Sequence, residues 1–166
     1  MESKHNVLSE NDLNFAKKTL SLKIKTFLEN ITKCNNIKSY SSKTDCVSNE
    51  IKAFLISITE DQKAVLNENF KKIISHLESL KNNKKIYFKN IHLIDENNKI
   101  LINLKSEKKK LCIKNKKAGV CRKKKSNKIN YFKNKIISIK KKNNLISKKI
   151  IQNIADIRKI EDFLSK

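Results

Sequence analysis

Residues 129–164 of the chain read INYFKNKIISIKKKNNLISKKIIQNIADIRKIEDFL. Most apolar side chains in this stretch follow one another at intervals of three, four or seven residues: Ile129, Phe132, Ile136, Ile139, Ile146, Ile150, Ile154, Ile157 and Leu164. Asn143 occupies the one position that the series skips. Side chains at these intervals lie on one face of an α-helix. The stretch therefore predicts one long amphipathic helix with a polar residue in its apolar seam.

The first half of the chain has the same periodicity. A first helix is expected from Ser9, an N-cap residue with acidic residues in the following turn, to about Cys34. Residues 35–44 are polar and predict a loop, and a second helix is expected from about residue 45 to about residue 80. In that helix Gln62 stands where the apolar seam calls for an apolar side chain.

Residues 84–104 are compatible with two structures. At helical spacing, one apolar seam runs through Tyr87, Ile91, Ile94, Asn98, Leu101 and Leu104. Alternatively, two β-branched and aromatic segments flank residues 95–98 as the turn of a β-hairpin. We prefer the helix because neither segment alternates strictly and an isolated hairpin is only marginally stable in water.

The charge is distributed unevenly. Of the net charge of +23, residues 1–80 carry +2 and residues 81–166 carry +21. Residues 105–128 contain 12 Lys and Arg and a single acid, Glu107. Because neighbouring like charges repel one another, this segment predicts a solvated loop between two helices.

These segments together predict the fold class and the division of the chain. With no proline and a single glycine, the chain lacks the residues that build tight turns. We expect an all-α fold: an elongated antiparallel bundle of three to four long helices, like a coiled coil. The expected parts are a disordered N-terminus (1–8), a helical hairpin or bundle (9–104), a basic loop (105–128) and a C-terminal amphipathic helix (129–166).

Several classes of site find no support in the sequence. The three histidines lie far apart, and there is no glycine-rich phosphate loop and no HExxH motif, so we expect no catalytic residue. Cys34 and Cys46 are separated by eleven residues and Cys112 and Cys121 by eight, too far for structural zinc pairs. We therefore expect neither metal nor cofactor. No secretory signal accompanies the cysteines, so the sequence provides no context for disulfides. For the same reason we expect a cytoplasmic protein. No apolar run is long enough for membrane insertion.

The basic segment indicates nucleic acid as one potential partner. Clustered Lys and Arg displace counterions from a phosphate backbone, here through Lys108, Lys109, Lys110, Lys116, Lys117, Arg122, Lys123, Lys124 and Lys125. Nearly all of these are lysine, whereas base recognition favours arginine, and the segment contains no aromatic residue for stacking. A solvated loop without a partner is the alternative. Self-association through residues 129–164, as in a structural coiled coil, is a further hypothesis.

A family resemblance gives the leading hypothesis. Asn97–Asn98 and Asn143–Asn144, the latter followed by Leu145 and Ile146, interrupt the helical repeat in a way that resembles the FlgN-like flagellar type III export chaperones of spirochaetes. The resemblance implies a cytosolic helical protein that holds the C-terminal helices of hook-filament junction proteins before export. Its own C-terminal helix would supply the docking face, here expected to comprise Ile136, Ile139, Asn143, Ile146, Ile150, Ile154 and Ile157.

Overall fold

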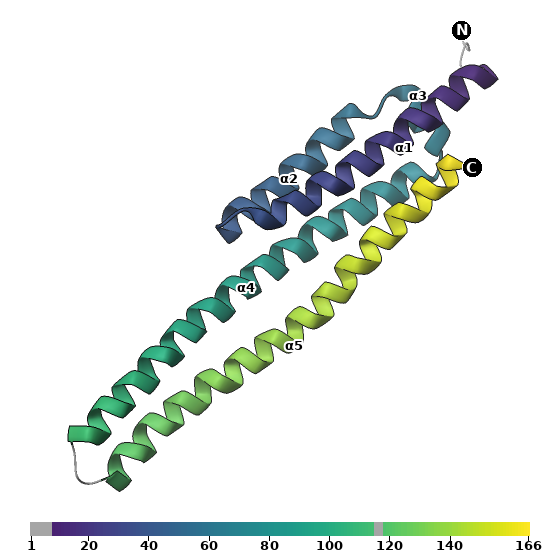
Figure 1. Cartoon of the computed structure of the whole chain (residues 1–166). Helices are drawn as coiled ribbons and strands as arrows, with labels where there is room; N and C mark the ends of the chain where they lie inside the picture. Colours follow the sequence, from purple (N-terminus) through teal and green to yellow (C-terminus); the bar gives the residue numbers. More distant parts are fainter. Residues whose placement is uncertain (1–7, 115–117) are drawn as a thin grey trace. The chain divides into compact units, whose positions relative to one another are not determined.

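The fold consists of helices with short connections. The computed structural model describes residues 8–114 and 118–166, with side chains described up to Cys112 and again from Ser126. These residues form five α-helices, one 3₁₀ turn and no strand (Figure 1): α1 (Glu10–Lys33), η1 (Cys34–Asn36), α2 (Tyr40–Ser57), α3 (Glu60–Leu66), α4 (Asn69–Lys114) and α5 (Ala118–Ser165). The predicted all-α class is confirmed. The β-hairpin alternative for residues 84–104 is wrong, because α4 runs through them.

The chain divides into two compact units, and α4 and α5 contribute to both. The first unit comprises Met1–Lys85 and Lys148–Lys166, and the second comprises Ile86–Ser147. These boundaries lie inside the two long helices, whereas the sequence placed boundaries after residues 104 and 128. Residues 1–7, which we predicted to be disordered, lie outside the described residues.

Helix α1 has the predicted start, end and apolar face. Ser9 accepts a hydrogen bond from the backbone N–H of Asp12 at 3.1 Å, which caps the helix as expected. Its buried face includes Leu20, Ile24 and Phe27, and the Phe27 ring lies 4.8 Å from that of Phe54 on α2. This face forms the centre of the first unit's core.

The single helix predicted for residues 45–80 is wrong, because the chain forms three helices there. Helix α2 begins earlier, at Tyr40, where Ser39 accepts from the backbone N–H of Ser42 at 3.0 Å. It ends at Ser57, because the backbone of the next residue, Ile58, is extended, and a second break lies at Asn67, with φ 54°. Apolar periodicity continues across both breaks, so the pattern alone did not reveal them.

Gln62, predicted to be a polar residue in an apolar seam, forms the cap of helix α3. Its Oε1 accepts from the Thr59 backbone N–H at 3.0 Å, while Thr59 Oγ1 accepts from the Gln62 backbone N–H at 3.2 Å. The same amide donates to Thr19 Oγ1 at 2.9 Å and accepts from Lys23 Nζ at 2.8 Å. The side chain is therefore buried, with both its amide oxygen and its amide nitrogen hydrogen-bonded.

A disulfide joins Cys34 to Cys46, which corrects the interpretation that the cysteines have no context for disulfides. The Cα atoms are 5.7 Å apart, within the range for a disulfide. Because α1 and α2 form an antiparallel pair, the two ends of the connection between them come together (Figure 1). Cys112 is also disulfide-bonded. The sequence separation that argued against zinc does not restrict a disulfide.

Candidate nucleic-acid interface

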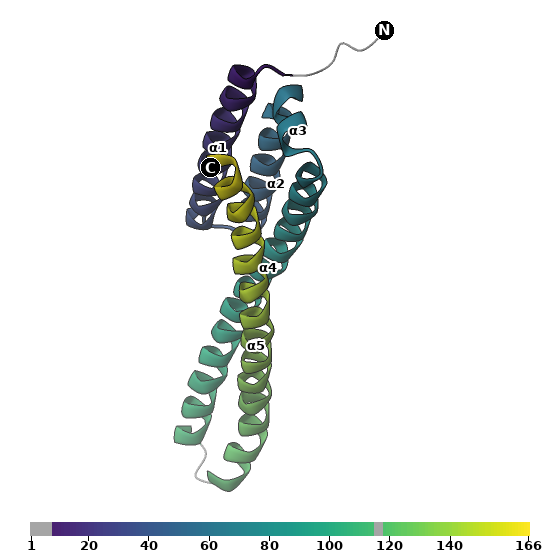
Figure 2. The same ribbon diagram turned by 90° about the vertical axis from the view of Figure 1, so that its right-hand side faces the viewer.

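The second unit is a hairpin of two helices with a narrow seam. Residues 86–114 of α4 and 118–147 of α5 lie side by side and antiparallel (Figure 2). Among the side chains of this unit that the structure describes, those that are buried are Phe88, Ile94, Asn97, Ile129, Ile136 and Asn143. A seam of this width leaves most of both helix surfaces to solvent.

The predicted basic loop at residues 105–128 is wrong. Helix α4 continues to Lys114 and α5 begins at Ala118, which leaves only residues 115–117 outside a described element. Lysine is a good helix former, and on a helix its charged groups diverge into water, where salt screens their repulsion. Repulsion between neighbouring lysines was therefore given too much weight in the sequence prediction.

The second unit carries most of the chain's charge on exposed side chains. Residues 86–147 contain 19 Lys and Arg against three acids, a net charge of +16. Of the 12 lysines in this unit whose side chains are described, all are exposed except the half-buried Lys108. We call residues 105–112 of α4 and 126–142 of α5 the basic end, which contains ten lysines and one acid.

Lysines from both helices of the basic end surround one hollow. Its volume is about 380 Å³, and it is lined by Lys105, Lys108, Lys109, Cys112, Ile129 and Lys133. Lys108 Nζ donates to Ser126 Oγ at 2.8 Å, which links α4 to α5 beside this hollow. Helix pairing thus brings together cationic groups that are more than 20 residues apart in the sequence.

A second group of basic residues contains an exposed aromatic ring. Lys128, Tyr131 and Lys135 have spacings of three and four residues and share one face of α5. Tyr131 is 60% exposed, and Lys135 Nζ lies 6.0 Å from the centre of its ring. The Tyr131 ring contacts Phe132 edge-on, with centroids 5.1 Å apart. This contact restrains the tyrosine while leaving most of its ring open to a ligand.

The predicted basic residues are only partly described. Lys109 and Lys110 are exposed at the basic end with Lys108. Lys116 and Lys117 lie outside the described residues, as do the side chains of Arg122, Lys123, Lys124 and Lys125. Lys105 belongs to the predicted basic segment, whereas sequence reasoning missed Lys133 and Tyr131. The helical spacing of residues 128, 131 and 135 could have indicated their common face. The prediction of a loop up to residue 128 separated Lys128 from the other two.

The predicted client-binding residues are largely buried within the chain. In the second unit Ile136 and Asn143 are buried, and in the first unit Ile150 and Ile157 are buried. Ile139, Ile146 and Ile154 are half-buried. Asn143 Oδ1 accepts from Asn90 Nδ2 at 3.3 Å, and its Nδ2 donates to the Tyr87 carbonyl at 3.5 Å. Four of the seven residues are thus covered by the chain's own packing, and the other three remain partly open to solvent.

Searches for other kinds of site and for relatives gave no match. Among the described residues, no three His, Cys, Asp or Glu side chains are placed to hold a metal ion. None of the helices, over the part of the chain that is described, is long and apolar enough to cross a membrane. No protein-family model, curated protein or solved structure matches the chain.

Proposed function

We propose that the protein binds nucleic acid through the basic end, without strong sequence preference. The observation that supports this most directly is the hollow in which Lys105, Lys108 and Lys109 of α4 meet Lys133 of α5. Cationic groups gathered in this way neutralise several adjacent phosphates and release their counterions, which drives association.

The residue types indicate what kind of nucleic acid fits. The lysines of the basic end are point charges suited to phosphates, and no described residue of that end is an arginine able to recognise guanine by two hydrogen bonds. Exposed Tyr131, between Lys128 and Lys135, offers a ring on which an unpaired base can stack. We therefore expect single-stranded DNA or RNA to be preferred over a duplex.

The test is a titration of a fluorescent single-stranded oligonucleotide with the full chain at several salt concentrations. The variant Lys105→Ala/Lys109→Ala/Lys133→Ala should weaken binding and reduce the slope of log K against log salt concentration by up to about 2. The control Lys52→Ala/Lys71→Ala/Lys72→Ala removes the same charge from exposed positions of the first unit. It should bind nearly as the wild type does.

Two results would contradict the proposal. Equal losses in the two triple variants would mean that only net charge matters, and equal competition by polyglutamate would mean that any polyanion suffices. A further variant, Tyr131→Ala, separates stacking from charge. It should weaken single-strand binding several-fold while leaving the salt slope unchanged.

The export-chaperone function stays a prediction from the resemblance. Its predicted docking residues lie in a seam that the chain itself fills. An amphipathic client would reach Ile136 or Ile150 only if α5 separated from α4 in the unit concerned. Binding of nucleic acid requires no such opening, which is why we place it first.

A further inference from the structure

A groove in the first unit lies between α1 and the C-terminal end of α5, and the nucleic-acid proposal does not involve it. Its volume is about 610 Å³. Its apolar side chains are Phe15, Leu22 and Leu164, and lysines accompany them at positions 17, 18, 25 and 166. None of the described residues that line it is an Asp or Glu. Phe15 is 69% exposed and Leu22 is 65% exposed, so two large apolar side chains of α1 lie together at this groove, away from the buried face of the helix.

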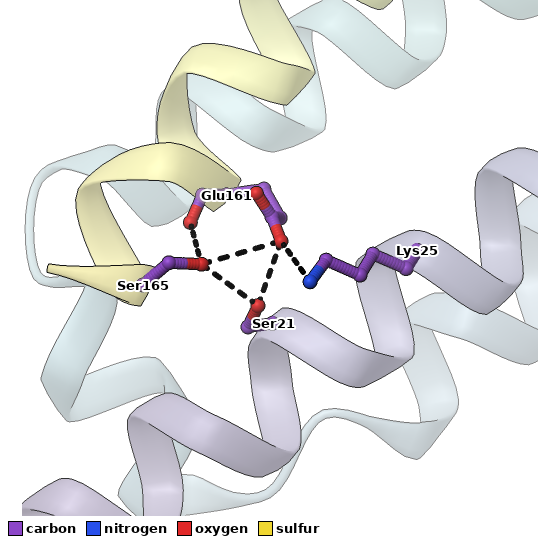
Figure 3. Close-up of polar contacts among 4 residues, drawn as sticks. All are labelled: Ser21, Lys25, Glu161 and Ser165. Atoms are coloured by element: carbon purple, nitrogen blue, oxygen red, sulfur yellow. Dashed lines mark hydrogen bonds and ion pairs between the residues drawn. The ribbon is translucent and has the colours of Figure 1, made fainter.

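The groove has a fixed wall because a buried carboxylate joins the two helices that form it (Figure 3). Glu161 Oε1 accepts from Ser21 Oγ at 2.8 Å and from Ser165 Oγ at 3.3 Å, and it lies 3.2 Å from Lys25 Nζ. Ser165 Oγ also donates to the Glu161 carbonyl at 3.1 Å. Ser21, Lys25 and Ser165 line the groove, so these bonds set the separation of its two sides.

The exposed residues of α1 repeat along one face. Phe15 and Leu22 are seven residues apart, and Lys18 and Lys25 are also seven residues apart. Two helical turns separate each pair, so apolar and cationic groups alternate along the groove. A partner helix with apolar side chains at matching intervals would place them against Phe15 and Leu22.

Three of the four lysines of the groove have no ion-pair partner in the part of the chain that the structure describes. Lys17, Lys18 and Lys166 form no ion pair with any residue in the described ranges. Lys25 is 62% exposed, and it shares its ion-pair partner, Glu161 Oε1, with the hydroxyls of Ser21 and Ser165. An occupant that carries carboxylates beside its apolar side chains would complement this surface.

We infer that this groove docks an acidic amphipathic helix of a protein partner. A second copy of the chain would present the same lysines and be repelled. A base of a nucleic acid can stack on the Phe15 ring, but a nucleic acid carries no aliphatic side chain to pack against Leu22 and Leu164. A bilayer surface is too broad to enter a groove of this size, whereas a single helix face fits into one.

The test uses the full chain and a helix-forming peptide whose leucines are spaced three, four and seven residues apart and flanked by glutamates. Binding is measured by fluorescence anisotropy. Leu22→Asp should weaken binding at least about tenfold, because it places a carboxylate where a leucine side chain would be buried. Ile151→Asp is the matched control, since Ile151 has the same 65% exposure elsewhere in the first unit. It should change binding less than about twofold.

Other occupants give distinguishable results. Equal binding of a peptide with every glutamate replaced by lysine would overturn the charge argument. Leu22-dependent dimerisation, or Leu22-dependent binding of anionic vesicles or of an oligonucleotide, would assign the groove to a different occupant and overturn the inference. Circular dichroism of both variants verifies that they are folded, and the exposure of Leu22 and Ile151 makes misfolding a small risk.

Discussion

At the residue scale, Glu161 shows how one buried carboxylate holds two helices together. Burial opposes its ionisation, but the hydrogen bonds from Ser21 and Lys25 and the charge of Lys25 outweigh that cost. The pKa of Glu161 therefore lies below its ordinary value. The unfolded chain binds a proton at this side chain at a higher pH than the folded chain does. Its contribution to stability is present above the ordinary glutamate pKa and is lost as pH falls through the lowered one.

Replacing Glu161 by glutamine should lower the free energy of unfolding by about 1–2 kcal/mol at neutral pH, because the charge-assisted hydrogen bonds are weakened. The loss should shrink as the solution is acidified, since the wild-type carboxylate is then protonated as well. Urea unfolding of both proteins across the acidic range measures this. Glu29→Gln, at an exposed position of α1, is the control. An equal loss at every pH would contradict the assigned role of the charge.

Lys84 and Lys85 show that residue type alone does not decide whether a side chain is buried. Lys84 is only 6% exposed, and its Nζ donates to Asn35 Oδ1 at 3.4 Å. Burial lowers the pKa of its ammonium group. Lys84 stands four residues after Leu80 and four before Phe88, both of which are buried, so helical spacing places it on the buried face of α4. The adjacent Lys85 lies off that face and is exposed.

At the element scale, two polar residues that interrupt apolar series serve different purposes. Gln62 forms hydrogen bonds with Thr59 at the start of α3 and with the side chains of Thr19 and Lys23, at distances of 2.8–3.2 Å. Asn143 forms only long hydrogen bonds, of 3.3 and 3.5 Å, in a hairpin seam. A lone asparagine in such a seam costs stability and favours one register. Sequence periodicity presents both residues as the same kind of interruption.

The two positions should therefore respond oppositely to leucine. Gln62→Leu should lower the free energy of unfolding by about 1–2 kcal/mol, since the Thr59 N–H loses its partner. Asn143→Leu should raise the free energy of unfolding by about 1 kcal/mol, because it adds apolar surface to the seam and leaves neither former partner without a hydrogen bond. The Tyr87 carbonyl belongs to a helix, and the half-buried Asn90 amide can bind water. Thermal and urea unfolding measure both changes. Stabilisation by Gln62→Leu would mean that this glutamine is a seam residue after all.

The Cys34–Cys46 disulfide closes the connection between α1 and α2. Replacing both cysteines by alanine should lower the free energy of unfolding by about 2–3 kcal/mol, because a short closed loop restricts the unfolded chain. Urea unfolding of the wild type and of the double variant, each with and without reductant, measures the effect. Reductant should lower the free energy of unfolding of the double variant by less than that of the wild type, because the variant no longer has this disulfide to lose. Disulfides persist mainly in oxidising compartments, so thiol titration of protein from its natural source also tests the predicted cytoplasmic location.

At the scale of the whole molecule, the charge divides unequally between the two units. The second unit carries +16 and the rest of the chain +7. Few acids lie close enough to lysines to offset this, and the ion pairs of Lys63, Lys81 and Lys99 are local pairs within single helices. Repulsion among lysines therefore opposes compaction more than ion pairs favour it.

Added salt should therefore stabilise the protein. Raising sodium chloride from about 0.01 to 0.15 M shortens the screening length from about 30 to 8 Å, and the melting temperature should rise by several degrees. Differential scanning calorimetry measures this, with sorbitol at equal osmolality as a control for non-ionic effects. A fall in melting temperature would show that attractive ion pairs outweigh the repulsion.

The helical class, the start of α1 and the concentration of charge in the second half follow from the sequence alone. They depend on spacing and capping within a few residues, so neighbouring residues in the sequence are enough to predict them. Tertiary structure decided the breaks around α3, the Cys34–Cys46 pairing and the burial of the C-terminal seam. It also decided that Lys133 joins Lys105 around one hollow, while Phe15 and Leu22 stay exposed beside Leu164. These features depend on which helix faces meet, and that choice is made by contacts between residues far apart in sequence.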